Sequence, residues 1–376
     1  MNDFQRISII GLGLMGGSLA MALRERSSCQ ITGFDLSEKA LDEAINRQLI
    51  DKKAASLEQA VEDAQLVVLA TPVGSYRSMC QKMVSGLNPG TVVTDLGSVK
   101  SPAMAAAETL PKHCHFVGGH PLAGSEKGGL AAASPYLFEN AYYFLTPGDR
   151  TPEAVMNQLK TWVSTLGAFP VIVNAGDHDR ILAKTSHFPH ATASLLATVV
   201  ADEADESMTA FTGSGFRDTT RIASGNPELW EEIFHLNRQE LMRCLHQLEI
   251  KTNRLRYALS EGDRRWIRDF LQAGKAFRDS LPQAGKDYLP AWYELYVDIK
   301  DQPGALAAIT GVLAQAGVNI REIEILHARE GDKGAVRLAF TSVDEEQAAM
   351  KALSGHGHSF ARSKGEKNHV DNESGL

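Results

Sequence analysis

Residues 6–26 read RISIIGLGLMGGSLAMALRER, an apolar run that passes through closely spaced glycines into a helical pattern. This order predicts a buried strand, a tight turn and a helix. The glycines have the spacing G-x-G-x-x-G: Gly11 permits the turn, Gly13 lets a ligand approach the backbone, and Gly16 lets the helix pack closely on the strand. The amino terminus of the helix then faces the ligand, where its N–H groups suit a phosphate.

A second apolar run, residues 29–35, predicts the next strand and ends in Asp35, about 20 residues beyond the glycines. A carboxylate at this place accepts hydrogen bonds from a ribose 2′-hydroxyl and repels a 2′-phosphate. The two features together predict binding of NAD rather than NADP. An ordinary strand, turn and helix with a surface aspartate is the simpler alternative. The residues expected to contact the cofactor are Gly11, Gly13, Leu14, Met15, Gly16, Asp35, Thr71 and Pro72.

The alternation of strands and helices continues along the chain. Further strands are predicted over residues 66–71, 91–95, 115–117 and 169–173, with helical patterns between them. This alternation is typical of a parallel sheet, so we predict an α/β Rossmann-type domain over residues 1–174. Ligands of such sheets bind beyond the carboxyl ends of the strands. Ser98, in a loop that follows one strand, is therefore expected near the ligand, although it could equally cap the next helix.

The stretch GGHPLAGSE, residues 118–126, follows the strand predicted over 115–117. Glycine and proline set the path of the backbone rather than fill a core, so we expect a turn that displays His120. At this edge of the sheet the imidazole would lie where cofactor and substrate meet. A turn histidine that bonds a nearby carbonyl is the alternative left open by the residue itself.

Beyond Val173 the pattern changes to long apolar-periodic runs, among them residues 179–200 and 228–259. We predict an all-α helical domain over residues 175–282 that pairs two copies of the chain into a homodimer. Two polar clusters are candidates for a substrate-binding wall. One is SHFPH, residues 186–190, on a helix that tolerates its proline; the other is GSGFRDTTR, residues 213–221, interpreted as a glycine-rich loop. A loop arginine suits bidentate binding of a carboxylate, although each residue alone could be merely packed or solvated.

Five motifs occur in a fixed order and are followed by Trp230: GLGLMGGS (11–18), DLGSVK (95–100), GGHPLAGSE (118–126), SHFPH (186–190) and GFRDTTRIA (215–223). In this combination residues 5–282 resemble the prephenate dehydrogenase family. The resemblance implies NAD-dependent oxidative decarboxylation of prephenate to 4-hydroxyphenylpyruvate in tyrosine biosynthesis. It also implies that His120 accepts the proton of the ring hydroxyl and that Ser98 orients His120 and the nicotinamide. The substrate-binding residues that it implies are Arg221, which would hold a carboxylate, and His190, Asp218, Trp230 and Glu126.

Two consequences of this resemblance concern pH and pocket shape. Because His120 must be neutral to accept a proton, activity is expected to fall as the pH drops through about 6.5, the ordinary pKa of histidine. Ser214 departs from the family pattern, which is glycine-rich throughout this loop, and the change puts the width of the pocket in doubt.

The carboxyl-terminal part has a pattern of its own. After a predicted linker, residues 283–292, a strand over 294–300 is followed by the turn DQPGAL, a helix up to Gly317, strands over 320–327 and 335–341, and a helix from Glu345. Residues 293–362 resemble an ACT domain, a small α+β ferredoxin-like fold. The resemblance implies feedback regulation by tyrosine, with the effector near Pro303, Gly304 and Asn319; a structural or dimerising module is the alternative. Residues 363–376 are polar and are predicted to be disordered.

Composition narrows the remaining classes. The net charge of −8 over 376 residues argues against nucleic acid or an anionic membrane as a partner. The four cysteines lack C-x-x-C spacing, as is typical of a reducing cytoplasm, and the histidines lack H-E-x-x-H spacing, so no metal is predicted. Three alternatives stay open: an arogenate dehydrogenase, a β-hydroxyacid dehydrogenase or imine reductase, and a non-catalytic binding protein that responds to amino acids.

Overall fold

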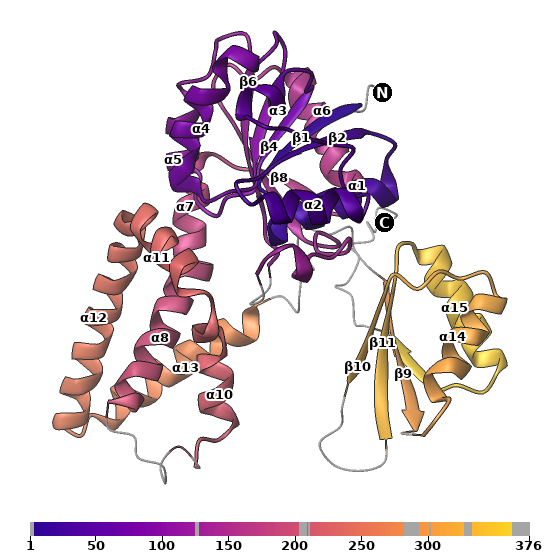
Figure 1. The fold of residues 1–376 in the computed structure, drawn as a ribbon. Helices are drawn as coiled ribbons and strands as arrows, with labels where there is room; N and C mark the ends of the chain where they lie inside the picture. Colours follow the sequence, from indigo (N-terminus) through magenta and orange to yellow (C-terminus); the bar gives the residue numbers. More distant parts are fainter. Residues whose placement is uncertain are drawn as a thin grey trace, which may run out of the picture. The chain divides into compact units, whose positions relative to one another are not determined.

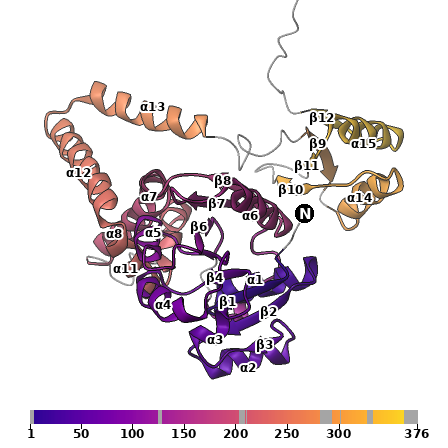
Figure 2. The same cartoon turned by 90° about the horizontal axis from the view of Figure 1, so that it is seen from above.

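The computed structural model describes residues 4–124, 128–202, 209, 211–281, 293–300, 302–326 and 333–362. The chain divides into two compact units, residues 1–263 and 264–376, and each is described by itself. The first contains an eight-stranded sheet and the helices up to α12, and the second contains α13 and a four-stranded sheet (Figures 1 and 2). None of the helices in the described ranges combines the length and the apolar character that a membrane span requires.

The eight-stranded sheet has the order β3-β2-β1-β4-β5-β6-β7-β8. Strands β1 to β6 run parallel, β7 is antiparallel to β6, and β8 is again parallel to β7. The order reverses between β1 and β4, which is where ligands bind in such sheets. The predicted Rossmann-type fold is therefore confirmed. The strands are β1 (Arg6–Ile10), β2 (Gln30–Phe34), β3 (Lys52–Lys53), β4 (Leu66–Leu69), β5 (Val92–Asp95), β6 (His115–Pro121), β7 (Tyr142–Pro147) and β8 (Phe169–Ile172).

Helices cover both faces of this sheet (Figure 1). Because side chains alternate along a strand, Ile9 of β1 joins the core beneath α1 and α6, whereas Ile10 joins the core beneath α3, α4 and α5. Ser37 and Ser56 cap α2 and α3 by accepting hydrogen bonds from Ala40 N and Gln59 N. The helices are α1 (Leu14–Arg26), α2 (Glu38–Asn46), α3 (Leu57–Val61), α4 (Tyr76–Met83), α5 (Ser101–Ala107) and α6 (Glu153–Thr165), with 3-10 turns at Val73–Ser75, Val84–Gly86 and Leu130–Ala132.

His120 does not lie on an exposed turn, and that expectation is wrong. It belongs to β6, where it pairs with Phe144 of β7, and only 7% of its surface is exposed. The strand extends past its two glycines because β7, for which the sequence offered no strong signal, binds its outer edge in antiparallel orientation. Gly119 is required here because a Cβ atom at this position would lie 2.3 Å from the carbonyl oxygen of Asp95.

The rest of the first unit is helical, as predicted, with two differences. Residues 228–259 form two helices rather than one, since the chain turns at Asn237, and the segment predicted as a glycine-rich loop is mostly the helix α10. SHFPH continues a helix through one π turn, in which the N–H of Phe188 reaches the carbonyl of Ala183, so the chain accommodates Pro189. The helices are α7 (Ala175–Leu182), the π turn (Ala183–His187), α8 (Phe188–Ala201), α10 (Ser214–Thr220), a 3-10 turn (Arg221–Ser224), α11 (Pro227–Leu236) and α12 (Arg238–Ser260).

The second unit contains the small α+β fold predicted from the sequence. Its antiparallel sheet has the order β10-β11-β9-β12, and helices α14 and α15 pack on one face of it (Figure 1). The short β12, which was not predicted, pairs with β9. The elements are α13 (Arg264–Ser280), β9 (Tyr293–Lys300), α14 (Ala305–Gln315), β10 (Glu322–Leu326), β11 (Lys333–Phe340), α15 (Val343–Gly355) and β12 (Phe360–Arg362). The linker predicted over 283–292 and the tail predicted over 363–376 lie outside the described residues.

Candidate functional site

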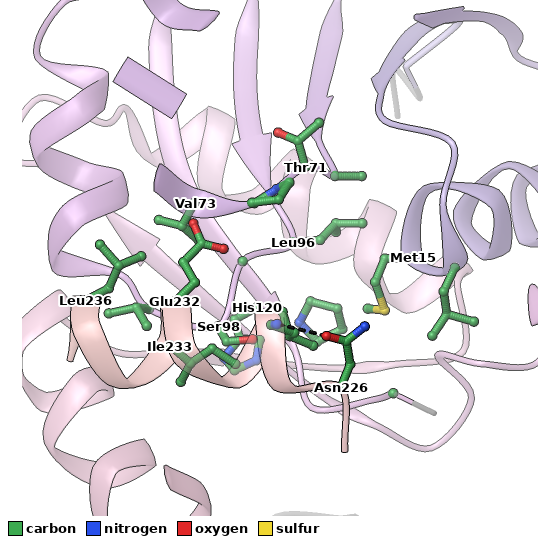
Figure 3. A pocket seen from close by; sticks show the side chains of 18 of the residues that line it. Met15, Thr71, Val73, Leu96, Ser98, His120, Asn226, Glu232, Ile233 and Leu236 are labelled. Carbon is green, nitrogen blue, oxygen red and sulfur yellow. Dashed lines mark hydrogen bonds between the residues drawn. The ribbon is translucent and has the colours of Figure 1, made fainter. Parts of the chain in front are cut away.

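A cavity of about 310 Å³ lies between the carboxyl edge of the eight-stranded sheet and helix α11 (Figure 3). We call its two sides the sheet wall and the helix wall. The sheet wall comprises Leu14, Met15, Ala70, Thr71, Pro72, Val73, Leu96, Gly97, Ser98, Val99, His120, Pro121, Ala123, Gly124 and Gly128. The helix wall comprises Asn226, Leu229, Glu232, Ile233 and Leu236.

The turn between β1 and α1 forms a cradle with room for a phosphate at the end of the cavity where Leu14 and Met15 lie. Gly11 has a φ of +99°, and a Cβ atom on Gly16 would lie 1.9 Å from the carbonyl oxygen of Gly11, so neither position accepts a side chain. Nothing lies within 4 Å of a Cβ atom built on Gly13, which leaves open space above the backbone. Helix α1 has no side-chain cap at its amino terminus and no acidic residue in its first turn. These features fit a diphosphate.

Asp35 follows β2 beside this cradle, where the sequence predicts a ribose-binding carboxylate. Its Oδ2 accepts a hydrogen bond from the N–H of Leu12 at 2.7 Å, and its Oδ1 accepts one from the N–H of Ser37 at 2.8 Å. The carboxylate thus ties the glycine turn to the start of the next helix. Each oxygen has a further lone pair, so the group can also accept a hydroxyl donor.

His120 is held from behind by a second histidine. Its Nδ1 lies 2.8 Å from Nε2 of His178, which is on α7, and Nδ1 of His178 lies 2.8 Å from Oδ1 of Asp179. The Asp179 carboxylate also accepts the backbone N–H groups of Lys100 at 2.7 Å and Ser101 at 2.8 Å. Among these groups, His120 lines the cavity and the others do not belong to its lining residues.

A buried ion pair supports the same part of β6. The Lys100 ammonium, which is fully buried, donates to Asp95 and to the carbonyl oxygen of Gly119, the latter at 2.6 Å. Asp95 in turn accepts the N–H of Gly119 at 2.9 Å and the N–H of Gly97 at 2.9 Å. Gly119, the residue just before His120, is therefore held at both its backbone N–H and its carbonyl oxygen, which positions the imidazole.

The electrostatic surroundings keep His120 neutral. Burial lowers its pKa well below the ordinary value, and the positive charges that His178, Lys100 and His187 can carry act in the same direction. Burial also lowers the pKa of His178, although the hydrogen bond to Asp179 opposes this change. The sequence placed the loss of activity near pH 6.5, and the structure moves that expectation to lower pH because His120 is enclosed rather than displayed.

The predicted site residues do not all meet in this cavity. Leu14, Met15, Thr71, Pro72, Ser98 and His120 line it together. The ring of His120 is hydrogen-bonded to His178, whereas Ser98 contributes to the wall nearby. Arg221 and Asp218 are exposed on the turn and helix that precede α11, outside the residues that line the cavity. Glu126 lies outside the described residues; Gly124 and Gly128, on either side of it in the sequence, belong to the sheet wall.

His190 and Trp230 form a packed cluster in the helical part. Their rings stack with centroids 3.6 Å apart, and Gly225 is needed beside them because a Cβ atom there would lie 2.5 Å from Nε1 of Trp230. Nδ1 of His190 is buried without a partner among the described residues. His187 is also buried, and its Nδ1 lies 3.0 Å from the side-chain nitrogen of Asn237.

The sequence did not reveal several residues that the structure brings to the site. His178 and Asp179 precede the SHFPH motif, and no motif marked them. Lys100 and Asp95 belong to the motif DLGSVK, in which the sequence predicts a role for Ser98 alone. The helix wall shows a helical spacing of residues 226, 229, 233 and 236, a signal that is indistinguishable in sequence from ordinary core packing. Glu232 was also missed; its Oε1 accepts the N–H of Gly74 at 2.6 Å, which ties the helix wall to the residue that follows Val73 of the sheet wall.

The three residues predicted to bind an effector are all exposed in the second unit. Pro303 and Gly304, whose φ is +87°, precede α14, and Asn319 follows it. A helix of 11 residues is about 16 Å long, so within one chain Gly304 and Asn319 lie near opposite ends of α14.

Three family models match consecutive parts of the chain. The prephenate dehydrogenase nucleotide-binding domain matches residues 19–172, the prephenate dehydrogenase dimerization domain matches residues 174–273, and the ACT domain matches residues 293–356. Prephenate dehydrogenase of Bacillus subtilis is 35% identical over 352 residues, which cover 92% of this chain and 95% of that protein. Cyclohexadienyl dehydrogenase of Zymomonas mobilis is 32% identical over 286 residues, which cover 75% of this chain and 97% of that protein.

Solved structures agree with these matches. The prephenate dehydrogenase of Aquifex aeolicus in complex with hydroxyphenyl propionate and NAD+ superposes with a TM-score of 0.69 at 29% identity, over 75% of this chain and 99% of that one. The arogenate dehydrogenase of Synechocystis superposes with a TM-score of 0.65 at 31% identity, over 73% of this chain and 99% of that one. The glycine cradle, the enclosed histidine and these similarities, which extend over nearly the whole chain, lead to one conclusion: the chain belongs to the prephenate dehydrogenase family.

Proposed function

We propose that the protein is an NAD-dependent prephenate dehydrogenase that converts prephenate to 4-hydroxyphenylpyruvate. The observation that carries this proposal is the position of His120, a buried histidine in the wall of the cavity at the carboxyl edge of the sheet, close to the glycine cradle. The Bacillus subtilis relative and the Aquifex aeolicus complex with NAD+ support the substrate and the cofactor.

The cofactor would be held at the carboxyl edge of β1, β2 and β4. Gly11, Gly13 and Gly16 leave room for the diphosphate, and Asp35 lies where it can accept a ribose hydroxyl. Leu14, Met15, Thr71 and Pro72 line the adjoining cavity. NAD, when bound there, supplies the acceptor for the hydride.

The reaction requires two things of the chain, namely alignment of the substrate with the cofactor and one proton acceptor. Prephenate carries a ring hydroxyl, a ring carboxylate and a pyruvyl side chain. Oxidation of the hydroxyl-bearing carbon, together with loss of the ring carboxylate as carbon dioxide, makes the ring aromatic. His120 accepts the hydroxyl proton, a role that its lowered pKa keeps available because the imidazole stays neutral. The apolar residues of both walls exclude water from the reacting groups. We therefore expect the acid limb of the rate profile to have its midpoint below pH 6.5.

Substrate recognition is proposed for the helical part. Arg221 would bind a carboxylate, and His190, Asp218, Trp230 and Glu126 would complete the binding residues, with Ser98 between His120 and the nicotinamide. The residues 175–282 would also pair two copies of the chain, since apolar side chains are exposed on α8 and α12 and the matching family model is named for dimerization. Those side chains are Leu195, Leu196, Val199, Met242, Ile250, Tyr257 and Leu259.

The ACT-like unit, proposed as residues 293–362, is assigned to feedback by tyrosine. Its family match and the exposed Pro303, Gly304 and Asn319 support an effector site. Because α14 separates these residues within one chain, an effector that contacts all three would have to lie between two copies of the unit.

Arogenate is the second candidate substrate. It presents the same ring to His120 and differs only in its side chain, and the arogenate dehydrogenase of Synechocystis is a neighbour at 31% identity. The test is to follow NADH absorbance with purified protein, NAD and either prephenate or arogenate, with and without tyrosine. We expect reduction with prephenate that tyrosine slows. Reduction with arogenate alone would move the substrate and keep the chemistry, whereas no reduction with either, in protein shown to bind NAD, would contradict the proposal.

A further inference from the structure

We propose that His178 and Asp179 are positioning residues that fix which nitrogen of His120 carries its proton. His178, next to the Asp179 carboxylate, receives the positive charge when His120 accepts a proton from substrate. The proposal deepens the proposed function, because it rests on His120 as the proton acceptor. It assigns roles to two residues that no sequence motif marked.

The hydrogen-bonded chain has a direction, and Asp179 sets it. The N–H groups of Lys100 and Ser101 can only donate, and both point at the Asp179 carboxylate, at 2.7 and 2.8 Å. They lie at the amino terminus of α5, where a negative charge is favoured. These contacts, with the His178 hydrogen bond, lower the pKa of Asp179 although it is largely buried, so the group is an anion that accepts.

The state of each imidazole follows from this anion. His178 Nδ1, 2.8 Å from Asp179, must carry a proton and donate, which leaves a lone pair on Nε2 of the neutral ring. That lone pair accepts from Nδ1 of His120, also at 2.8 Å. His120 therefore carries its own proton on Nδ1, and its Nε2 is free to accept a proton from a ligand in the cavity. A histidine without this partner would have no such fixed tautomer.

Proton transfer along this chain balances. The substrate hydroxyl proton moves to Nε2 of His120, and the Nδ1 proton of His120 moves to Nε2 of His178. His120 ends neutral, His178 ends as an imidazolium, and its Nδ1–H remains bonded to the Asp179 carboxylate. The two rings together gain one proton and one positive charge, and the substrate hydroxyl loses the same proton and charge.

The charged groups around the two rings favour this final state. His120 is faced by Lys100, His178 and His187, all of which disfavour a positive charge on it. His178 is also faced by Lys100, but Asp179 and Asp95 act on it in the opposite direction. The positive charge is thus better placed on the second ring, farther from the cavity and next to its counter-ion.

The test reads the tautomer directly, without substrate. Full-length protein labelled with 15N-histidine is examined by NMR at pH 7.5, and His120→Asn assigns the His120 signals among those of the 12 histidines. We expect His120 to be protonated on Nδ1 in the wild type. His178→Phe, which keeps a ring beside Phe144, should return His120 to a mixture dominated by Nε2–H. His178→Gln should retain the Nδ1 proton, because its carbonyl oxygen can still accept. His113→Gln is the matched control, because His113 is exposed and lies two residues before β6 begins.

Steady-state kinetics with prephenate separate orientation from charge transfer. We expect kcat to fall roughly 100-fold in His178→Phe and about 10-fold in His178→Gln, with KM for prephenate within about threefold of wild type. The glutamine in His178→Gln can accept the hydrogen bond from His120 but cannot take up its proton. This variant therefore measures the loss of charge transfer alone. His113→Gln should match the wild type.

Two results would overturn the proposal. One is wild-type His120 protonated on Nε2, which needs no variant and so cannot be confused with misfolding. The other is a folded His178→Phe whose kcat stays within twofold of wild type. If instead the wild type shows the expected tautomer but turns over neither prephenate nor arogenate, the proposed function fails while the assigned protonation stands.

Discussion

The sheet wall and the helix wall of the cavity are built in different ways. Around His120, hydrogen bonds hold the side chain, the preceding peptide and the supporting Asp95 and Lys100, in a region with almost no exposed surface. The helix wall is anchored by apolar packing of Ile233 and Leu236, while Leu229 is half exposed. Under the proposed function, the proton acceptor would be placed at strand ends, where geometry is rigid, and the helices would supply the adaptable side of the substrate pocket.

Removing the proposed proton acceptor from the sheet wall should have the largest effect on the rate. For His120→Asn we expect kcat to fall on the order of 1,000-fold, because general-base catalysis is lost while both walls stay in place. Binding of NAD, measured by calorimetry, should stay within about twofold. A variant that keeps a tenth of the wild-type rate would show that His120 is not the proton acceptor.

Removing a charge from the helical part should affect binding instead. For Arg221→Ala we expect KM for prephenate to rise about 10- to 50-fold with little change in kcat, because a grip on a carboxylate holds ground state and transition state alike. Steady-state kinetics check this, with Arg217→Ala on the preceding helix as the control. An unchanged KM would leave Arg221, exposed outside the cavity, without a part in recognition.

A third prediction concerns the stability of the helical part around the buried His187. The pKa of His187 is lowered to about 4 by burial. In the unfolded chain this imidazole binds a proton near pH 6.5, whereas in the folded protein it stays neutral down to about pH 4. The free energy of unfolding therefore falls as the pH drops from 6.5 toward 4. Between pH 7 and 5 the wild type should lose about 2 kcal/mol more than His187→Gln, measured by urea unfolding. The exposed His246→Gln should follow the wild type; equal losses in all three proteins would refute the assignment.

The smallest effect is expected where the two walls touch. Glu232→Gln preserves an oxygen that can accept from Gly74 N, so it removes only the charge at a partly exposed contact. We expect KM for NAD to change by less than about threefold, consistent with less than about 1 kcal/mol, and kcat to be unchanged. A large loss of kcat would mean that this carboxylate takes part in the chemistry.

Part of the site could be predicted because local pattern determines it. The glycine spacing of residues 11–16 acts within one turn, and Asp35 directly follows the strand that places it. The Rossmann-type, helical and ACT-like folds and the family were also predicted and are confirmed. The roles of the individual site residues stay predictions.

The partners of His120 could not be predicted, because they are distant in sequence. His178 lies 58 positions away, and Lys100 and Asp179, joined by a backbone hydrogen bond, are 79 apart. The expectation of an exposed turn around His120 was wrong for the same reason. The strand that covers this segment, β7, begins only at residue 142 and pairs with β6 in the folded chain. Glycines that suggest a turn locally also permit close approach of another strand.

The sequence by itself determined the alternation of strands and helices, the glycine turn with Asp35 beside it, and the family to which the chain belongs. Each depends on residues that act on their neighbours or recur in order. Only the tertiary structure decided that His120 is enclosed and neutral, that Asp179 orients it through His178, and that α11 closes the cavity. Those features arise where burial and hydrogen bonds join separate elements, and no local pattern carries that information.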